Sequence, residues 1–309
     1  MHRINLWPFM ILLLGVLACK SDRPAESSPT QGEVIIGCDV QIKELMLQQE
    51  MIFEQQYKHA DVHLQFYNER DLLRLWMSDS FRTVIMGRPL DSSEILFFQK
   101  QKQVTPRHFP FAIGAISLIS LKTPSDTNIH YEQLISILQG KSIDRLPYKS
   151  LVIEDASSGI APYLLQWAGI KEFKQNVYAL EGKEAIFKYL ENHPEALAVM
   201  DWTAFSDSDD REAMNRLQRF RVIAIDQPKD SIPYGFVLPE QYNLQDHKYP
   251  LQRDWHFISC SGKSDLGLGF ASFVAGEIGQ RIILKAGLLP VYQTERWVEW
   301  IPGDYKIVN

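Results

Sequence analysis

Three segments carry residues that can bind an oxyanion, each where a predicted strand gives way to a helix. They are Asp39 with Val40, then Arg88, and then the run Ser157, Ser158 and Gly159. Hydroxyl groups donate hydrogen bonds, glycine lets a ligand approach the backbone, and a guanidinium fork matches a tetrahedral oxyanion. Unpaired N–H groups and the helix dipole also favour an anion at a helix start. These segments are therefore candidates for an anion-binding site.

Each candidate also has a simpler structural explanation. The two serines are favoured helix N-caps, Arg88 fits a solvated surface position, and Asp39 fits a cap of the first helix. As a ligand group, Asp39 would accept a hydrogen bond from hydrogen phosphate and so discriminate against sulfate. Glu154 and Asp155 precede the serines and would repel an anion unless they point away or accept its protons. They could instead be acid/base catalysts, although neighbours on a strand face opposite sides.

The elements that must position these segments alternate between strands and helices. Short β-branched runs predict strands at 33–39, 60–67, 83–87, 111–121, 150–155, 176–180, 196–202, 220–226 and 249–260. Apolar residues at helical spacing predict helices at 42–57, 69–79, 91–102, 131–141, 157–169, 182–192 and 266–287, with Ser92 or Ser93 opening the third. This alternation indicates two α/β lobes, each with a mainly parallel sheet flanked by helices.

Composition and motifs exclude several classes of function. The chain has 309 residues, 45% hydrophobic, and a formal net charge of −6 without a basic patch, so nucleic acid is not an expected partner. The sequence contains no HExxH motif, Cys/His cluster, GxSxG elbow or P-loop, and its histidines are scattered. We therefore expect no metal and no cofactor. No nucleophile is placed beside a base, so we do not expect an enzyme. The rival interpretation is a hydrolase that uses Asp39, Glu154 or Asp155.

The N-terminus has the features of a bacterial lipoprotein. A basic start and a short apolar run end in VLAC, which matches a lipobox and predicts a signal peptide at residues 1–18 and lipidation of Cys19. Residues 19–32 are polar and rich in Pro and Ser, as in a flexible tether. The protein is thus expected to be anchored to a membrane by lipid only, facing the periplasm or the cell exterior. Whether Cys38 and Cys260 form a disulfide stays open.

Several stretches together resemble PstS-type phosphate-binding proteins of ABC importers, in the lipoprotein branch of Bacteroidetes-type bacteria. They are VIMGRPLDSSE, YEQLISILQGK, SLVIEDASSG, ALAVMDW and YPLQRDWHFIS with the following GFASFVAGEIGQRIILKAGLLP. The resemblance implies a type II periplasmic-binding-protein fold with two lobes joined by crossover strands near 109–115 and 248–254. Lobe 1 would comprise 33–113 plus 252–309, and lobe 2 would comprise 114–251. A monomer that captures phosphate in an interlobe cleft and delivers it to an ABC permease is the implied function.

The sequence departs from the usual family pattern in both ligand loops. Glu154 stands where an Arg is common, Ile160 stands where a Thr is common, and Gly87-Arg88 replace an Asp. Arg88 would then supply the missing cation from the opposite lobe. A sensor or protein-binding lipoprotein that kept the fold but binds another oxyanion, or no small ligand, is the alternative.

Overall fold

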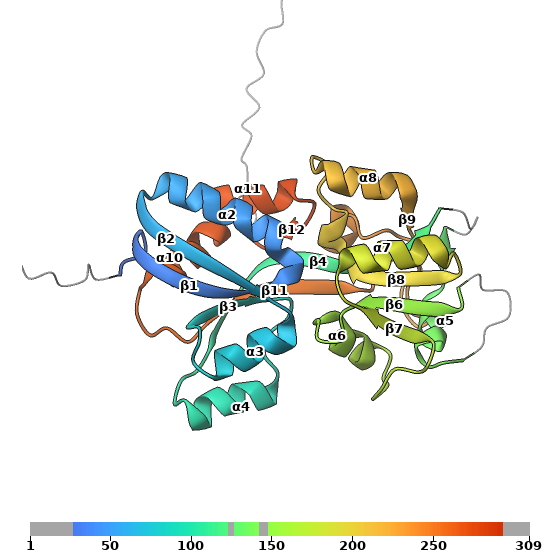
Figure 1. The fold of residues 1–309 in the computed structure, drawn as a ribbon, viewed down its shortest axis with the longest axis horizontal. Coiled ribbons are helices and arrows are strands. Elements are labelled where there is room, and N and C mark those ends of the chain that lie inside the picture. Colours follow the sequence, from blue (N-terminus) through green and yellow to red (C-terminus); the bar gives the residue numbers. More distant parts are fainter. Residues whose placement is uncertain (1–26, 123–126, 142–147, 293–309) are drawn as a thin grey trace, which may run out of the picture.

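The computed structural model describes residues 27–122, 127–141 and 148–292, which form two α/β lobes side by side (Figure 1). The main sheet is mixed and runs in the order β2-β1-β3-β11-β4-β8-β6-β7, with β9 and β12 also paired to β4. Strands β10 (Ala224–Ile225) and β5 (Asn128–Ile129) form a separate parallel pair. The predicted two-lobe α/β fold is confirmed.

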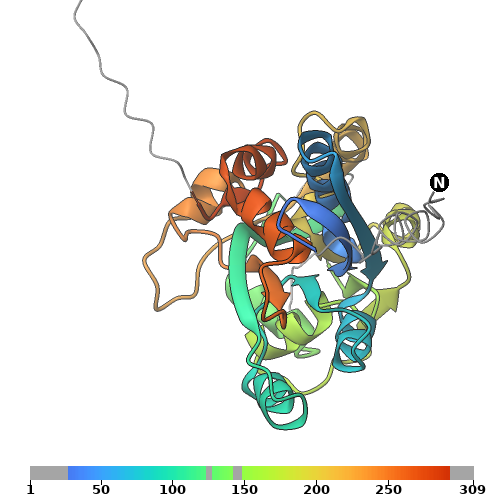
Figure 2. The same ribbon diagram turned by 90° about the vertical axis from the view of Figure 1, so that its left-hand side faces the viewer.

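Lobe 1 has a parallel core of three strands with helices on both faces. The strands are β1 (Gln31–Asp39), β2 (His59–Tyr67) and β3 (Thr83–Met86). Helices α2 (Lys43–Gln56), α10 (Leu266–Ala275) and α11 (Glu277–Lys285) cover one face, and α3 (Glu69–Met77) and α4 (Ser92–Gln101) cover the other (Figure 1, Figure 2). All four residues of β3 are buried, as expected for a strand covered on both faces.

Lobe 2 repeats this arrangement. Its parallel strands are β6 (Ser150–Glu154), β7 (Val177–Leu180) and β8 (Ala196–Asp201), and every residue of β8 is buried. Helices α5 (Tyr131–Leu138) and α6 (Ile160–Trp167) lie on one face, and α7 (Lys183–Asn192) and α8 (Arg211–Arg219) lie on the other (Figure 1). Short helix α9 (Gln241–Gln245) leads the chain back toward lobe 1.

Two long strands connect the lobes. Strand β4 (Arg107–Leu121) pairs with β11 (Gln252–Ser259) along its first part and with β8 and β9 (Phe220–Val222) along its last part. Strand β11 also pairs with β3, and β12 (Leu289–Pro290) returns to β4. Residues on these two strands can therefore contact side chains from both lobes.

Four apolar clusters form the core, one on each face of each half of the sheet. In lobe 1, Phe257 and Phe270 meet edge to face with centroids 5.8 Å apart, beneath α10. On the opposite face, Trp76 of α3 and Phe98 of α4 lie 4.3 Å apart. These buried rings fix the helices against the sheet, and with them the loops at the strand ends.

Several predicted boundaries are wrong in detail. The helix predicted over 266–287 breaks at Gly276, which ends α10 and caps α11 in an extended conformation. The cap of α4 is Asp91, not Ser92 or Ser93; Asp91 and Glu94 form a reciprocal capping box. The strand predicted at 220–226 is divided into β9 and β10, and helices α8 and α9 were not predicted. Both helices are short and mostly polar, so their apolar spacing is only a weak signal.

The predicted signal peptide and Cys19 lie outside the described residues, as does most of the tether. The end of the tether, however, packs against lobe 1: Ser27 Oγ accepts from the Leu266 N–H at 3.3 Å, and β1 begins at Gln31. Cys38 and Cys260 are both free thiols. Within residues 27–122, 127–141 and 148–292, no helix has the length and apolar character needed to cross a bilayer.

Candidate ligand-binding site

Strand ends from both lobes converge on one buried guanidinium, that of Arg253 on β11. Its Nη2 lies 3.2 Å from Asp39 Oδ2 at the end of β1, and its Nη1 lies 3.0 Å from Asp201 Oδ2 at the end of β8. Its Nε donates to the carbonyl of Gly87, just after β3, at 3.1 Å. The residue is only 3% exposed. The group at this meeting point of the two lobes is thus a cation supplied by the chain itself.

The two aspartates are held in the same way in the two lobes. Asp39 caps the 3-10 helix η1 (Val40–Ile42), and Asp201 caps η2 (Trp202–Ala204). In each case Oδ1 accepts at 3.0 Å from the N–H two residues further on, which leaves Oδ2 for Arg253. Burial raises the pKa of Asp39 to about 7, although Arg253 acts in the opposite direction.

Glu69, the first residue of α3, lies between two arginines. Its Oε1 accepts from Arg88 Nε at 2.8 Å, and its Oε2 lies 3.6 Å from Arg253 Nη2. Arg88 also forms a bidentate pair with Glu94, with both distances at 2.8 Å, and this hydrogen bonding raises the pKa of the Arg88 guanidinium. The predicted cation of lobe 1 is therefore matched by two acids of its own lobe.

The serine loop of lobe 2 is organised by Asp155, which has a positive φ of 49°. Its Oδ1 accepts from the N–H and the hydroxyl of Ser157 at 2.8 and 2.7 Å, and its carbonyl accepts from Ser158 Oγ at 2.8 Å. Its Oδ2 accepts from Asn68 Nδ2 of lobe 1 at 2.7 Å. The N–H of Arg70 donates to the Ser157 carbonyl at 3.0 Å, so this loop is docked on the start of α3.

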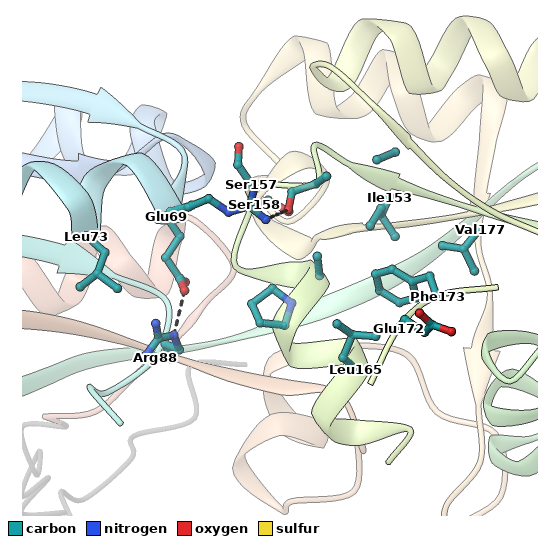
Figure 3. A pocket seen from close by; sticks show the side chains of 15 residues that line it. Glu69, Leu73, Arg88, Ile153, Ser157, Ser158, Leu165, Glu172, Phe173 and Val177 are labelled. Atoms are coloured by element: carbon teal, nitrogen blue, oxygen red, sulfur yellow. Dashed lines mark hydrogen bonds and ion pairs between the residues drawn. The ribbon is translucent and has the colours of Figure 1, made fainter. Parts of the chain in front are cut away.

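A pocket of about 480 Å³ lies between α3 and this loop (Figure 3). Arg88 lines it from lobe 1, and Ser157 and Ser158 line it from lobe 2. The remaining lining residues are mainly apolar: Glu69, Arg70, Leu73, Ile153, Ala156, Ala161, Pro162, Leu165, Glu172, Phe173, Val177 and Ala179. The lining includes two arginines and two glutamates, so it has no net formal charge.

The other three predicted ligand residues are not in this pocket. Asp39 contacts Arg253, Val40 opens η1, and Gly159 caps α6 beside the buried cluster. A Cβ on Gly159 would come within 2.1 Å of Glu69 Oε2 and within 2.5 Å of Arg253 Nη2. The structure thus divides the predicted residues between an outer pocket and an inner cluster around Arg253.

Arg253, Glu69 and Asp201 are the site residues that the sequence analysis missed. A signal for Arg253 was present, because side chains alternate along a strand and Arg253 therefore shares a face with Trp255 and Phe257. In the structure its guanidinium stacks on the Trp255 ring at 4.6 Å. A charged residue on the apolar face of a strand needs buried partners, and acids at strand ends are the residues able to supply them.

Glu154, the acid at the end of β6, is buried. Glu154 is 6% exposed, and burial raises its pKa, while Lys183 acts in the opposite direction.

No group of His, Cys, Asp and Glu side chains able to hold a metal occurs in the part of the chain that the structure describes. His59 and His63, which are four residues apart, both lie on strand β2.

Two α/β lobes, two connecting strands and a site between the lobes define a solute-binding fold. Residues 23–277 match the PBP superfamily domain, and the chain belongs to this family. No curated protein matches it in sequence.

Among solved structures, the chain is similar to a phosphate ABC transporter substrate-binding protein with bound phosphate from Clostridium perfringens. That protein has a TM-score of 0.68 and 16% identity, over 84% of this chain and all of the other. An ABC-type phosphate transport receptor from Vibrio cholerae has a TM-score of 0.62 and 17% identity, over 83% and 99%. PstS from Borrelia burgdorferi has a TM-score of 0.52 and 15% identity, over 84% and 99%. The resemblance to PstS-type proteins is confirmed for the fold.

Proposed function

We propose that this protein is a lipid-anchored, extracytoplasmic solute-binding protein that captures phosphate or a related oxyanion and delivers it to an ABC permease. The observation that carries the proposal is that Arg88 from lobe 1 and Ser157 and Ser158 from lobe 2 line one pocket. A cation and two hydroxyls from opposite lobes suit an anion that is held between the lobes. Asp39, Val40 and Gly159 form the inner wall of the cleft in this proposal.

A ligand in the pocket competes with three internal carboxylates. It would take Ser157 from Asp155, and it would take Arg88 from Glu69 and Glu94. Asp155 keeps the amide of Asn68, Glu69 keeps Arg253, and Glu94 keeps the N–H of Asp91. Because no acid is left without a partner, displacing them costs less than breaking an isolated buried ion pair, which is about 3–5 kcal/mol.

Equilibrium dialysis of the purified chain against radiolabelled phosphate tests this function. We expect saturable retention without turnover, competition by arsenate, and a loss of about 10- to 100-fold in affinity in Ser157→Ala with Ser158→Ala and in Arg88→Ala. Arg74→Ala is the matched control, since Arg74 is also on lobe 1 but its side chain is 72% exposed. Absence of retention, or equal affinity in all variants, would contradict the proposal.

A second candidate function is favoured by the acceptors within the chain that already bind the predicted anion donors. Each predicted anion donor already has an acceptor from the chain: Asp155 for the serines, and Glu69 and Glu94 for Arg88. A sensor or protein-binding lipoprotein that closes without a small ligand would show this pattern. It predicts no change in melting temperature across phosphate, arsenate, sulfate, molybdate and phosphonates, together with a co-purifying protein partner. Phosphate-dependent stabilisation would exclude it.

A further inference from the structure

Arg253 has the contacts that a bound ligand would have in a closed two-lobe protein. Its guanidinium offers five N–H donors, and five acceptor groups surround it. They are the carboxylates of Asp39, Glu69 and Asp201, the side-chain oxygen of Gln41 and the carbonyl of Gly87. One face of the guanidinium rests on the Trp255 ring. Four of these groups accept hydrogen bonds from Arg253, and Glu69 Oε2 adds an ion-pair contact at 3.6 Å.

The acceptors come from both lobes, while Arg253 itself is on a connecting strand. Asp39, Glu69 and Gly87 belong to lobe 1, and Asp201 belongs to lobe 2. Thr203 lies in η2, the 3-10 helix whose N-cap is Asp201. Its hydroxyl donates to the Gln41 carbonyl of lobe 1 at 2.8 Å. Separating the lobes would pull Asp201 and Asp39 away from a shared cation and expose both to water or to other partners.

The electrostatics of this inner position favour a cation. Three carboxylates converge there, and the side chains of Asp39 and Asp201 are 1% exposed. A dianion would have to desolvate beside these acids, which already hold the guanidinium. A planar cation with donors on three nitrogens suits acceptors that are placed around it in this way.

We propose that the inner interlobe position is a guanidinium-binding site filled in cis by Arg253, and that this occupation holds the lobes closed without a diffusible ligand. This inference concerns the inner cluster and does not depend on which ligand, if any, the outer pocket takes. The chemical class that the site accepts is a guanidinium cation. Removal of the side chain should therefore leave a cavity that free guanidinium can fill.

The test is chemical rescue of Arg253→Gly in the otherwise intact chain. We expect its melting temperature to fall by about 10 °C, because three buried acids lose their partner. Guanidinium chloride or methylguanidine at about 20 mM, far below denaturing concentrations, should restore a large part of this loss by binding the folded state. Ammonium and sodium chloride at the same ionic strength should not. Arg74→Gly controls for an arginine outside the cluster.

Small-angle X-ray scattering of the same samples shows whether the lobes open. We expect a larger radius of gyration for Arg253→Gly, which returns toward the wild-type value with guanidinium. The proposal is overturned if guanidinium affects wild type and Arg253→Gly equally, or if the variant is as stable and compact as Arg74→Gly. Phosphate binding is measured separately, so failure of one proposal does not imply failure of the other.

A measurement on the wild-type protein covers the case in which Arg253→Gly does not fold. In nitrogen-15 NMR spectra, a buried guanidinium held by these acceptors should give resolved Nη–H signals that exchange slowly with water. The exposed guanidinium of Arg74 should give averaged, fast-exchanging signals. Fast exchange at every arginine would overturn the proposal.

Discussion

Replacing Gly159 by alanine adds one methyl group at the closest approach of lobe 2 to the buried cluster. The backbone of Gly159 has φ −66° and ψ −13°, which alanine adopts without strain. The added Cβ would lie 2.1 Å from Glu69 Oε2 and 2.5 Å from Arg253 Nη2, where ordinary contacts are 3.4–4 Å. Any effect of the substitution therefore reports on this contact and not on backbone conformation.

The expected loss in the free energy of unfolding follows from the shift that the added methyl group forces on Glu69. The Glu69 carboxylate must shift by more than about 1 Å, as in an overpacked core, which costs about 1–3 kcal/mol. Arg88 holds the other oxygen of Glu69 at 2.8 Å, so the shift also weakens a buried ion pair. We expect a loss of about 3 kcal/mol in the free energy of unfolding, or about 6–12 °C in melting temperature.

The assay is thermal and urea denaturation of Gly159→Ala beside Gly262→Ala. No heavy atom lies within 4 Å of a Cβ placed on Gly262, and its φ is not positive, so this control should change stability by no more than about 0.5 kcal/mol. Equal stability of the two variants would refute the close packing of α6 against Glu69 and Arg253. It would also remove the structural basis for a closed lobe arrangement centred on Arg253.

Three further predictions concern single side chains. The pKa of Asp39 is raised to about 7 in the folded state, so between about pH 4 and pH 7 the folded protein binds one more proton at Asp39 than the unfolded chain does. The free energy of unfolding should therefore fall as the pH rises toward 7, by up to about 1.4 kcal/mol per pH unit. Asp39→Asn should lack this slope; His256, whose pKa is lowered to about 4, has the opposite slope in both proteins and cancels in their difference. Tyr249→Phe should lose about 1–3 kcal/mol in urea denaturation, since its hydroxyl donates to a buried backbone carbonyl at 2.8 Å. Asp91→Ala should lose about 1 kcal/mol and Ser92→Ala almost nothing, because Asp91 is the cap.

Each of these has a contradicting result. Parallel pH profiles for wild type and Asp39→Asn would mean that the Asp39 carboxyl titrates normally. A neutral Tyr249→Phe would mean that water satisfies the carbonyl, and a larger loss in Ser92→Ala than in Asp91→Ala would reverse the assignment of the cap.

Local sequence determined most of the elements and the order in which they alternate. Runs such as TVIM and ALAVMD are short, apolar and continuous, and only a strand buried on both faces suits them. The cap of α4 was misplaced by one or two residues, because Asp91 and the serines after it are all favoured caps. Polar helix α8 was missed, since its apolar side is short: Ala213 is buried and Leu217 packs against the core beside it.

The sequence by itself placed Asp39, Arg88 and the serines at strand ends, where ligands gather in α/β folds. It did not determine their partners, because ion pairs form between residues that are distant in the chain. Arg253 lies 214 positions from Asp39 and 52 from Asp201. Only the tertiary structure brought these acids around one guanidinium and placed Glu69 between Arg88 and Arg253, whereas Asp155 binds Ser157, which is two residues away. The alternation of side chains along β11 indicates that Arg253 is buried. The path of β11 between the lobes determines which acids, Asp39 and Asp201, lie beside it.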